Sequence, residues 1–318
     1  MIFRREPLDT VLDWLHAELE RAGEAICWVP DPDAGHGLGL YAGESGPAGI
    51  HRPYLSWLDA AELLDAHFLT PEREGDHVRL HFRRRATLPA DRSADRYAAG
   101  SEFSRIDKLE DPHLHRDLAE ALTRADLKAG ARILSLGVNS GQELTLLESV
   151  YPGHRFELLG LDIEASALAL ARARFPAFRF ELRDVTTLPD PALGTFDLIL
   201  ALSLLQSPGI VIEDLLRGLR LGQLAAGGAF ILGFPNARYR GQTLSYGARM
   251  LNFARPDLSL LVRDVAGVRR HLQRHGFTVY VTGKYEVLVT AVQHEGGASG
   301  ETRRKRREEI GAVQETVG

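Results

Sequence analysis

Apolar positions recur along the first 90 residues in two patterns, one with helical spacing and one typical of strands. Residues 8–22 carry apolar side chains at helical spacing, which predicts a helix that ends near Gly23. The apolar run at 25–29 predicts a strand. Residues 30–53 are rich in Gly, Pro and Asp, so we expect a loop there with a short strand at 38–41.

The next segments complete a small N-terminal unit of mixed structure. A second helix is expected over residues 58–68, capped by Ser56 or Asp59 and closed by Pro71. His77–Arg84 alternates apolar and polar residues, which predicts a half-buried strand. Residues 1–90 are therefore expected to form a small α+β unit, followed by a polar linker over 86–100.

Beyond residue 110, short apolar runs alternate with helical segments. A helix is expected from Asp111, which caps a first turn containing Pro112, to about Asp126. The strands that follow are expected at 132–136, 156–161, 179–182, 196–200, 229–234, 277–281 and 286–291, and the helices at 142–150, 166–175, 210–224 and 265–275. This alternation predicts a doubly wound parallel sheet. Only residues 282–285 separate the last two strands, which suits an antiparallel hairpin.

The predicted fold is thus α/β, with a doubly wound, mostly parallel seven-stranded sheet, a terminal antiparallel strand and a small α+β N-terminal unit. The expected boundaries are 1–90 for the N-terminal unit, 91–126 for a linker and capping helix, 127–293 for a Rossmann-like domain, and 294–318 for a mobile charged tail.

Composition narrows the function classes. The 318 residues carry a net charge of −5, so no global positive field attracts nucleic acid. The single cysteine, Cys27, excludes an internal disulfide and favours a reducing, cytoplasmic location, with the thiol expected to be a buried small side chain. No run of 18 apolar residues predicts a membrane span, and no histidine–cysteine spacing predicts a metal site.

A glycine-bearing turn follows the first strand of the second part and reads Gly137-Val138-Asn139-Ser140-Gly141-Gln142-Glu143. A phosphate-binding P-loop needs Lys followed by Ser or Thr, and both are missing. A dinucleotide fingerprint needs three glycines, and Asn139 and Gln142 occupy two of those positions. The remaining spacing, Gly137 to Gly141, suits a single nucleoside with an amino-acid tail, whose approach to the backbone would explain the glycines.

Carboxylates stand at the ends of the next strands, where ligands bind in open α/β sheets. Asp162 ends the second strand, about 20 residues after the turn, and is placed to accept hydrogen bonds from ribose hydroxyls; a helix cap is the alternative. Asp184 follows the third strand, where it can accept from an adenine amino group or remain a solvated turn residue. Asp197 opens the fourth strand and is expected to be structural.

Together these features resemble a class I S-adenosylmethionine-dependent methyltransferase over residues of about 130–292. The resemblance rests on the glycine turn, Asp162, Asp184, the strand Phe196-Asp197-Leu198-Ile199, and residues 215–231 with Gly227-Gly228 before a strand. That family ends its sheet with one reversed strand, as expected here. The resemblance implies S-adenosylmethionine as cofactor, held by Ser135, Gly137, Asn139, Gly141, Glu143, Asp162, Ile163, Asp184, Val185 and Ala201.

Two positions depart from the family pattern. Ser135 stands where the family has an acid, and Asn139 stands where it has a glycine. Glu143 is the candidate to replace the missing charge near the ammonium group of the cofactor. Asn tolerates positive φ, so Asn139 remains compatible with the turn.

The residues that would bind the methyl acceptor are expected outside the glycine turn. Candidate acceptor-site residues lie before the domain and after its fourth and fifth strands, namely Tyr97, Phe103, Ser203, Gln206, Asn236, Arg238, Tyr239 and Tyr246. No general base can be named. The motif of amino-group DNA methylators is missing after the fourth strand, and Cys27 lies outside the domain. A small molecule or a protein side chain is therefore the favoured acceptor.

Two alternatives remain open. One is an RNA methyltransferase whose N-terminal unit binds RNA through Arg79 and Arg83–Arg85. The other is a non-catalytic module that binds S-adenosylmethionine as a sensor or scaffold. A nicotinamide oxidoreductase would require the missing glycines.

Overall fold

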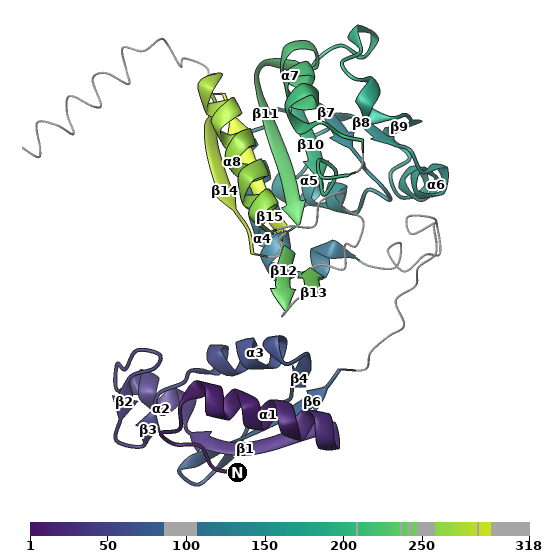
Figure 1. Cartoon of the computed structure of the whole chain (residues 1–318). Coiled ribbons are helices and arrows are strands. Elements are labelled where there is room, and N and C mark those ends of the chain that lie inside the picture. Colours follow the sequence, from purple (N-terminus) through teal and green to yellow (C-terminus); the bar gives the residue numbers. More distant parts are fainter. Residues whose placement is uncertain are drawn as a thin grey trace, which may run out of the picture. The chain divides into compact units, whose positions relative to one another are not determined.

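The chain separates into two compact units, Met1–Ala90 and Asp91–Gly318 (Figure 1). The structure is a computed structural model that describes residues 1–85, 107–207, 209–235, 237–240, 243–246, 258–284 and 286–293. The expected linker at 86–100 and the expected tail at 294–318 lie outside these residues. Each unit has its own buried apolar core.

The N-terminal unit packs helices on an antiparallel sheet with the order β1-β6-β4, in which β5 also pairs with β6. Its elements are α1 (Leu8–Ala22), β1 (Glu24–Pro30), α2 (Pro32–Gly37), β2 (Ser45–Gly46), β3 (Gly49–Ile50), α3 (Tyr54–Leu63), β4 (Ala66–Phe68), β5 (Glu72–Glu74) and β6 (His77–Arg84). The predicted first helix, first strand and strand 77–84 are confirmed. Val11, Leu15 and Leu19 bury one face of α1, and Cys27 is fully buried as predicted.

Two predictions in this unit are wrong. Residues 38–41 form no strand, and Leu38 and Tyr41 are exposed. The segment instead begins with α2, where the Asp31 side chain accepts from the Asp33 amide, and ends in the β2–β3 pair.

The helix expected over 58–68 is displaced toward the N-terminus. α3 has no side-chain cap, so neither Ser56 nor Asp59 plays that role. The helix ends at Leu63, Asp65 adopts a positive φ of 53°, and β4 pairs with β6. Sheet pairing therefore overrides the helical spacing of the last apolar residues.

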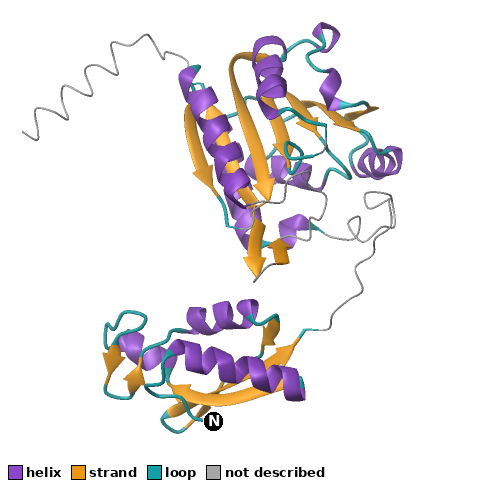
Figure 2. Ribbon diagram, in the orientation of Figure 1, coloured by secondary structure: helices purple, strands orange, loops and turns teal. Residues whose placement is uncertain are grey.

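The second unit is built on a seven-stranded sheet with the order β14-β15-β11-β10-β7-β8-β9 (Figure 2). Its strands are β7 (Arg132–Leu136), β8 (Glu157–Asp162), β9 (Arg179–Leu182), β10 (Phe196–Leu202), β11 (Leu224–Pro235), β14 (Thr278–Thr282) and β15 (Glu286–Val292), and its further hairpin is β12 (Ala237–Arg240) and β13 (Thr243–Tyr246). Its helices are η2 (Lys108–Glu110), α4 (Pro112–Ala125), η3 (Gln142–Leu144), α5 (Thr145–Val150), α6 (Ala165–Arg174), η4 (Val185–Thr187), η5 (Pro191–Leu193), α7 (Ile212–Gly222) and α8 (Leu258–Arg274). The α/β class and the mostly parallel seven-stranded sheet are confirmed.

β15, the last strand among the described residues, runs antiparallel to its neighbours, as predicted. β15 is antiparallel to both β11 and β14 and lies between them, so β14 forms the edge of the sheet. This arrangement brings the start of β15 to the carboxyl ends of the parallel strands, because Glu286 pairs with Pro235. β11 begins five residues before the predicted position and pairs with β10 across a register shift.

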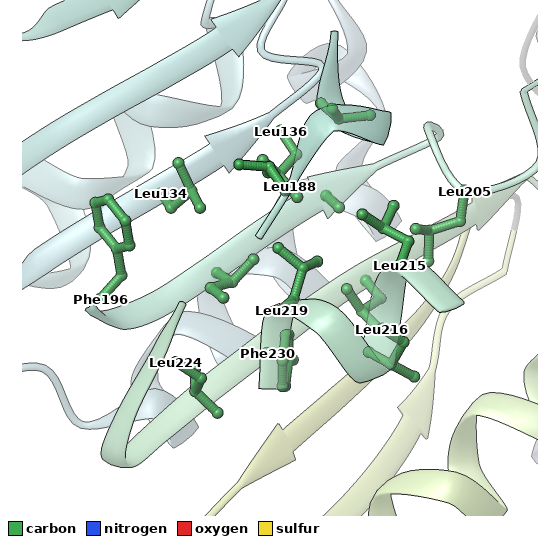
Figure 3. Close-up of a cluster of buried hydrophobic side chains, with 14 of the residues drawn as sticks. Leu134, Leu136, Leu188, Phe196, Leu205, Leu215, Leu216, Leu219, Leu224 and Phe230 are labelled. Atoms are coloured by element: carbon green, nitrogen blue, oxygen red, sulfur yellow. The ribbon is translucent and has the colours of Figure 1, made fainter. Parts of the chain in front are cut away.

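Successive residues of the central strands point to opposite faces, and each face buries its own cluster. Leu134 and Ile199 face α7 and α8, whereas Ile133 and Leu198 face α4, α5 and α6. Figure 3 shows the first cluster, with Leu215 and Leu219 of α7 packed over the sheet. Both clusters hold the central strands rigidly, so the loops at their carboxyl ends start from fixed positions.

No helix among the described residues is long and apolar enough to cross a membrane. The same residues contain no group of three or more His, Cys, Asp or Glu side chains arranged to hold a metal ion.

Candidate functional site

The turn after β7 is held against β8 by backbone hydrogen bonds. The amides of Gly137 and Val138 both donate to the carbonyl of Leu161, at 2.8 and 3.1 Å. Gly137, Asn139 and Gly141 have φ values of 65°, 47° and 70°. Asn139 therefore adopts the left-handed conformation that asparagine tolerates better than most residues.

Packing within the chain explains both glycines of this turn. A Cβ atom on Gly137 would lie 3.0 Å from Leu204, and one on Gly141 would lie 3.2 Å from Leu144 and 3.3 Å from Phe175. Positive φ adds a second requirement for glycine. The approach of a ligand to the backbone is therefore not needed to account for either residue, contrary to the expectation from sequence.

Asp162, at the tip of β8, ties this turn in place. Its Oδ2 accepts from the amide of Asn139 at 2.8 Å, and its Oδ1 accepts from the amide of Glu164 at 2.9 Å. Burial raises the pKa of the Asp162 carboxyl, and the amide hydrogen bonds act in the opposite direction. The cap of α6 is Glu164, whose side chain accepts from the amide of Ser166, so Asp162 does not cap that helix. The amides of Asn139, Glu164 and Ile163 use three of the roughly four acceptor sites of this carboxylate, which leaves acceptor capacity for a ligand hydroxyl.

Glu143 lies in η3, directly after the glycine turn. Burial raises the pKa of its carboxyl to about 7, the negative charge of Asp162 acts in the same direction, and the positive charges of Lys108 and Arg174 oppose the rise. Ser135 is buried within β7 and carries no charge. A half-buried carboxyl with this pKa is stabilised in its ionised form by a cationic ligand, which fits the ammonium group of an amino-acid tail.

The remaining predicted cofactor residues take different positions. Ile163 directly follows Asp162 and is 74% exposed, so it offers a large apolar surface at the strand tip. Val185 and Ala201 are buried in the core and would meet a ligand through their backbone. Asp184 is exposed and caps η4 by accepting from the amide and hydroxyl of Thr186, which lowers the pKa of its carboxyl.

A second set of polar side chains lies at the carboxyl ends of β10 and β11. Ser203 follows β10, and its hydroxyl donates to Glu286 Oε1 at 2.5 Å, while Lys108 Nζ donates to the Ser203 hydroxyl at 3.1 Å. Gln206 donates to Asp264 of α8 at 3.4 Å. Sequence reasoning proposed Ser203 and Gln206 but missed Lys108 and Glu286. The sequence signal that could have found Glu286 is its position as the single charged residue at the start of the mostly apolar strand 286–292.

The structure does not describe the side chains of the other candidate acceptor residues. Tyr97, Phe103 and Asn236 lie outside the described residues. Arg238 and Tyr239 lie on β12 and Tyr246 on β13, whose backbone pairing is described without their side chains.

Three of the four arginines of the N-terminal unit that were considered for RNA binding have acidic partners. Arg79 pairs with Glu72 at 2.9 Å, and Arg84 pairs with Glu20 at 3.1 Å. Arg85 lies 3.9 Å from Asp65. These pairs reduce the positive field that a phosphate backbone would meet.

Comparison with known proteins adds sequence evidence from methyltransferases. A trans-aconitate 2-methyltransferase of Methylobacterium nodulans is 40% identical over 92 residues, or 29% of this chain and 34% of the relative. The protein of the same name from Variovorax paradoxus is 33% identical over 123 residues, or 39% of this chain and 46% of the relative. The chain thus spans less than half the length of these curated relatives. No family model matches.

Among solved structures, a methyltransferase of Aquifex aeolicus described as S-adenosylmethionine-dependent aligns with a TM-score of 0.41 at 20% identity, covering 60% of this chain and 98% of that one. The predicted resemblance is confirmed: the second unit has the expected mixed sheet, and the chain is similar in sequence to curated methyltransferases. The mostly parallel seven-stranded sheet and the turn after β7 agree with the Rossmann-like fold that the resemblance implied.

Proposed function

We propose that this chain transfers the methyl group of S-adenosylmethionine to a small-molecule acceptor. The observation that carries the proposal is the carboxylate of Asp162, which holds the glycine turn at the carboxyl end of β7. In open α/β sheets this is where a nucleoside binds, with a strand-tip carboxylate on its ribose. The sequence similarity to named methyltransferases supports methyl transfer among the nucleoside-dependent reactions.

Within this proposal, three side chains have separate roles. Asp162 accepts hydrogen bonds from the ribose hydroxyls, and Glu143 binds the ammonium group of the amino-acid tail. Ile163 covers one face of the adenine with its exposed apolar side chain. Asp184 contributes through the turn that it caps, and Ser135, Val185 and Ala201 line the site from within the strands and η4.

The cofactor supplies the activated methyl group when it is bound, so the chain itself must position the acceptor and exclude water. We assign this task to residues 127–293, with 91–126 as linker and capping helix. Residues 1–90 are proposed as an accessory unit. The ion pairs of Arg79 and Arg84 with acidic side chains argue against RNA binding by this unit. The non-catalytic binding module remains the competing function.

The test uses the full chain and S-adenosylmethionine with an isotopically labelled methyl group. A panel of small acceptors, including trans-aconitate, is incubated with both, and labelled product and S-adenosylhomocysteine are measured. The proposal expects labelled product from at least one acceptor. Tight cofactor binding without transfer to any acceptor would instead establish the binding module.

A further inference from the structure

Three side chains from distant parts of the sequence form a polar cluster at the carboxyl ends of β10 and β11. Lys108 comes from η2, Ser203 follows β10, and Glu286 opens β15. Ser203 has a positive φ of 56°, and its amide donates to the carbonyl of Gly233 at 2.9 Å. The cluster is thus fixed to the central strands of the sheet.

Hydrogen-bond chemistry fixes the direction of each contact in this cluster. An ammonium group has only donors, so the Ser203 oxygen accepts from Lys108. The single proton of the Ser203 hydroxyl is then directed to Glu286 Oε1. A Cβ atom on Gly233 would lie 2.6 Å from that same Oε1, so glycine is needed there to admit the carboxylate.

The second oxygen of Glu286 has no such partner. Glu286 is 4% exposed, and its Oε2 accepts no hydrogen bond within the described part of the chain. Leaving a buried carboxylate oxygen unpaired is costly, so a buried polar atom without a partner calls for a physical explanation such as a catalytic role or a bound ligand. A hydrogen-bond donor on a ligand would satisfy it.

This cluster adjoins the cofactor residues. Leu204, the residue after Ser203, contacts the position of Gly137 in the glycine turn. Lys108 is close enough to Glu143 for its charge to act on that carboxyl. Lys108 therefore interacts with both groups, because its charge acts on Glu143 and its ammonium group donates to Ser203.

We propose that Glu286 selects the methyl acceptor and serves as its proton acceptor, so that this chain methylates a hydroxyl or an amine and not a fully ionised polycarboxylate. The inference rests on the proposed function. Oε2 accepts a hydrogen bond from the O–H or N–H of the acceptor, while Ser203 and Lys108 are positioning residues that orient the carboxylate. An acceptor with only carboxylates would place negative charge against an unpaired buried carboxylate oxygen.

The transfer step balances with the groups named. The oxygen or nitrogen of the acceptor forms a bond to the methyl carbon with its own electron pair, and its proton passes to Glu286 Oε2. The carbon–sulfur bond breaks, and its electron pair stays on sulfur as a neutral thioether. Glu286 then releases the proton to solvent.

The experiment compares the parent chain with Glu286→Gln and with Glu157→Gln, which alters an exposed carboxylate at the amino end of β8. The probes are ethanolamine, glycine and phenol as donor-bearing acceptors, and trans-aconitate as the polycarboxylate. Single-turnover transfer of a labelled methyl group gives the rate, and calorimetry gives the affinity for S-adenosylmethionine.

For the parent, the proposal expects transfer to at least one donor-bearing probe at a rate at least about tenfold above that for trans-aconitate. Glu286→Gln should lower that rate at least about a hundredfold without changing cofactor affinity, because loss of a general base costs this much. Glu157→Gln should change neither quantity.

Transfer to trans-aconitate in preference to the other probes, or an unchanged rate in Glu286→Gln, would overturn the assignment of Glu286 and leave the proposed function standing. A parent that binds no S-adenosylmethionine, or transfers its methyl group to no probe, would overturn the proposed function and this inference with it.

Discussion

The backbone amide of Asn139 donates a hydrogen bond to the carboxylate of Asp162, at 2.8 Å. The tip of β8 thereby holds the turn that follows β7, and the conformation of the turn depends on a carboxylate that is also the proposed ribose ligand. Changes at Asp162 will affect turn geometry and ligand contacts together, so the two effects need separate measurements.

Affinity for S-adenosylmethionine should rise with pH. The pKa of Glu143 is about 7, so its carboxyl is mostly neutral at pH 6 and mostly ionised at pH 7.5. Only the ionised form attracts the ammonium group of the cofactor, and we expect a several-fold gain over this range. Calorimetric titration checks it, with Glu143→Gln expected to bind weakly and without this pH dependence. An equal pH dependence in Glu143→Gln would show that another group is responsible.

In the absence of ligand, the Glu143 carboxyl should lower the free energy of unfolding as pH rises. The pKa of Glu143 in the folded chain lies above the ordinary value of 4.5, so the folded state holds the proton to a higher pH than the unfolded state does. Its contribution to stability is therefore present below about pH 4.5 and is lost as pH rises to about 7. Comparing urea unfolding of the parent and Glu143→Gln at pH 5 and pH 7.5 isolates this effect, which is missing from the variant.

Substitution of Gly141 should destabilise the second unit more than substitution of Gly153. Both have positive φ, at 70° and 75°, but only Gly141 is crowded, by Leu144 and Phe175. We expect Gly153→Ala to cost about 1–2 kcal/mol in strain and Gly141→Ala at least about 1 kcal/mol more. Denaturant unfolding followed by circular dichroism measures both. Equal losses would contradict the packing around the turn.

Asp197 should prove structural. Its Oδ2 accepts from the amide of Arg132 at 2.7 Å, at the amino end of β10, away from the proposed site. Asp197→Ala is expected to lower the free energy of unfolding by roughly 1–3 kcal/mol because that amide loses its partner, with cofactor affinity unchanged. Asp214→Ala, on the exposed face of α7, is the control. A loss of cofactor binding in well-folded Asp197→Ala would contradict this role.

Cys27 should be unreactive until the N-terminal unit unfolds. The thiol is fully buried, and burial raises its pKa to about 12, so almost no thiolate exists at pH 8. The labelling rate with a thiol reagent is expected to follow the unfolding of this unit, which the fluorescence of Trp14, Trp28 and Trp57 also reports. Rapid labelling of the folded chain would contradict the packing of β1.

The sequence predicts most elements of the second unit, because strands there are apolar runs bounded by clear turn residues. Prediction failed where tertiary contacts override local pattern: β4 forms at Ala66–Phe68 because β6 is available to pair with it. The proposed cofactor contacts were predicted from one turn and one strand tip, both of which are local features of the sequence. The sequence did not predict Lys108 and Glu286 as site residues, because 95 and 83 residues separate them from Ser203. Only the folded sheet brings the three side chains together.

Calorimetric titration of the parent, Asp162→Asn and Asp162→Ala with S-adenosylmethionine tests the central claim most directly. The account predicts micromolar binding by the parent, about 4 kcal/mol tighter than a millimolar ligand, and a loss of at least about 1.5 kcal/mol for Asp162→Ala, the scale of charge-assisted hydrogen bonds. Unfolding of both variants is measured alongside, so that a collapsed turn is recognised. Parent-like affinity in folded Asp162→Ala would contradict the placement of the nucleoside at this turn.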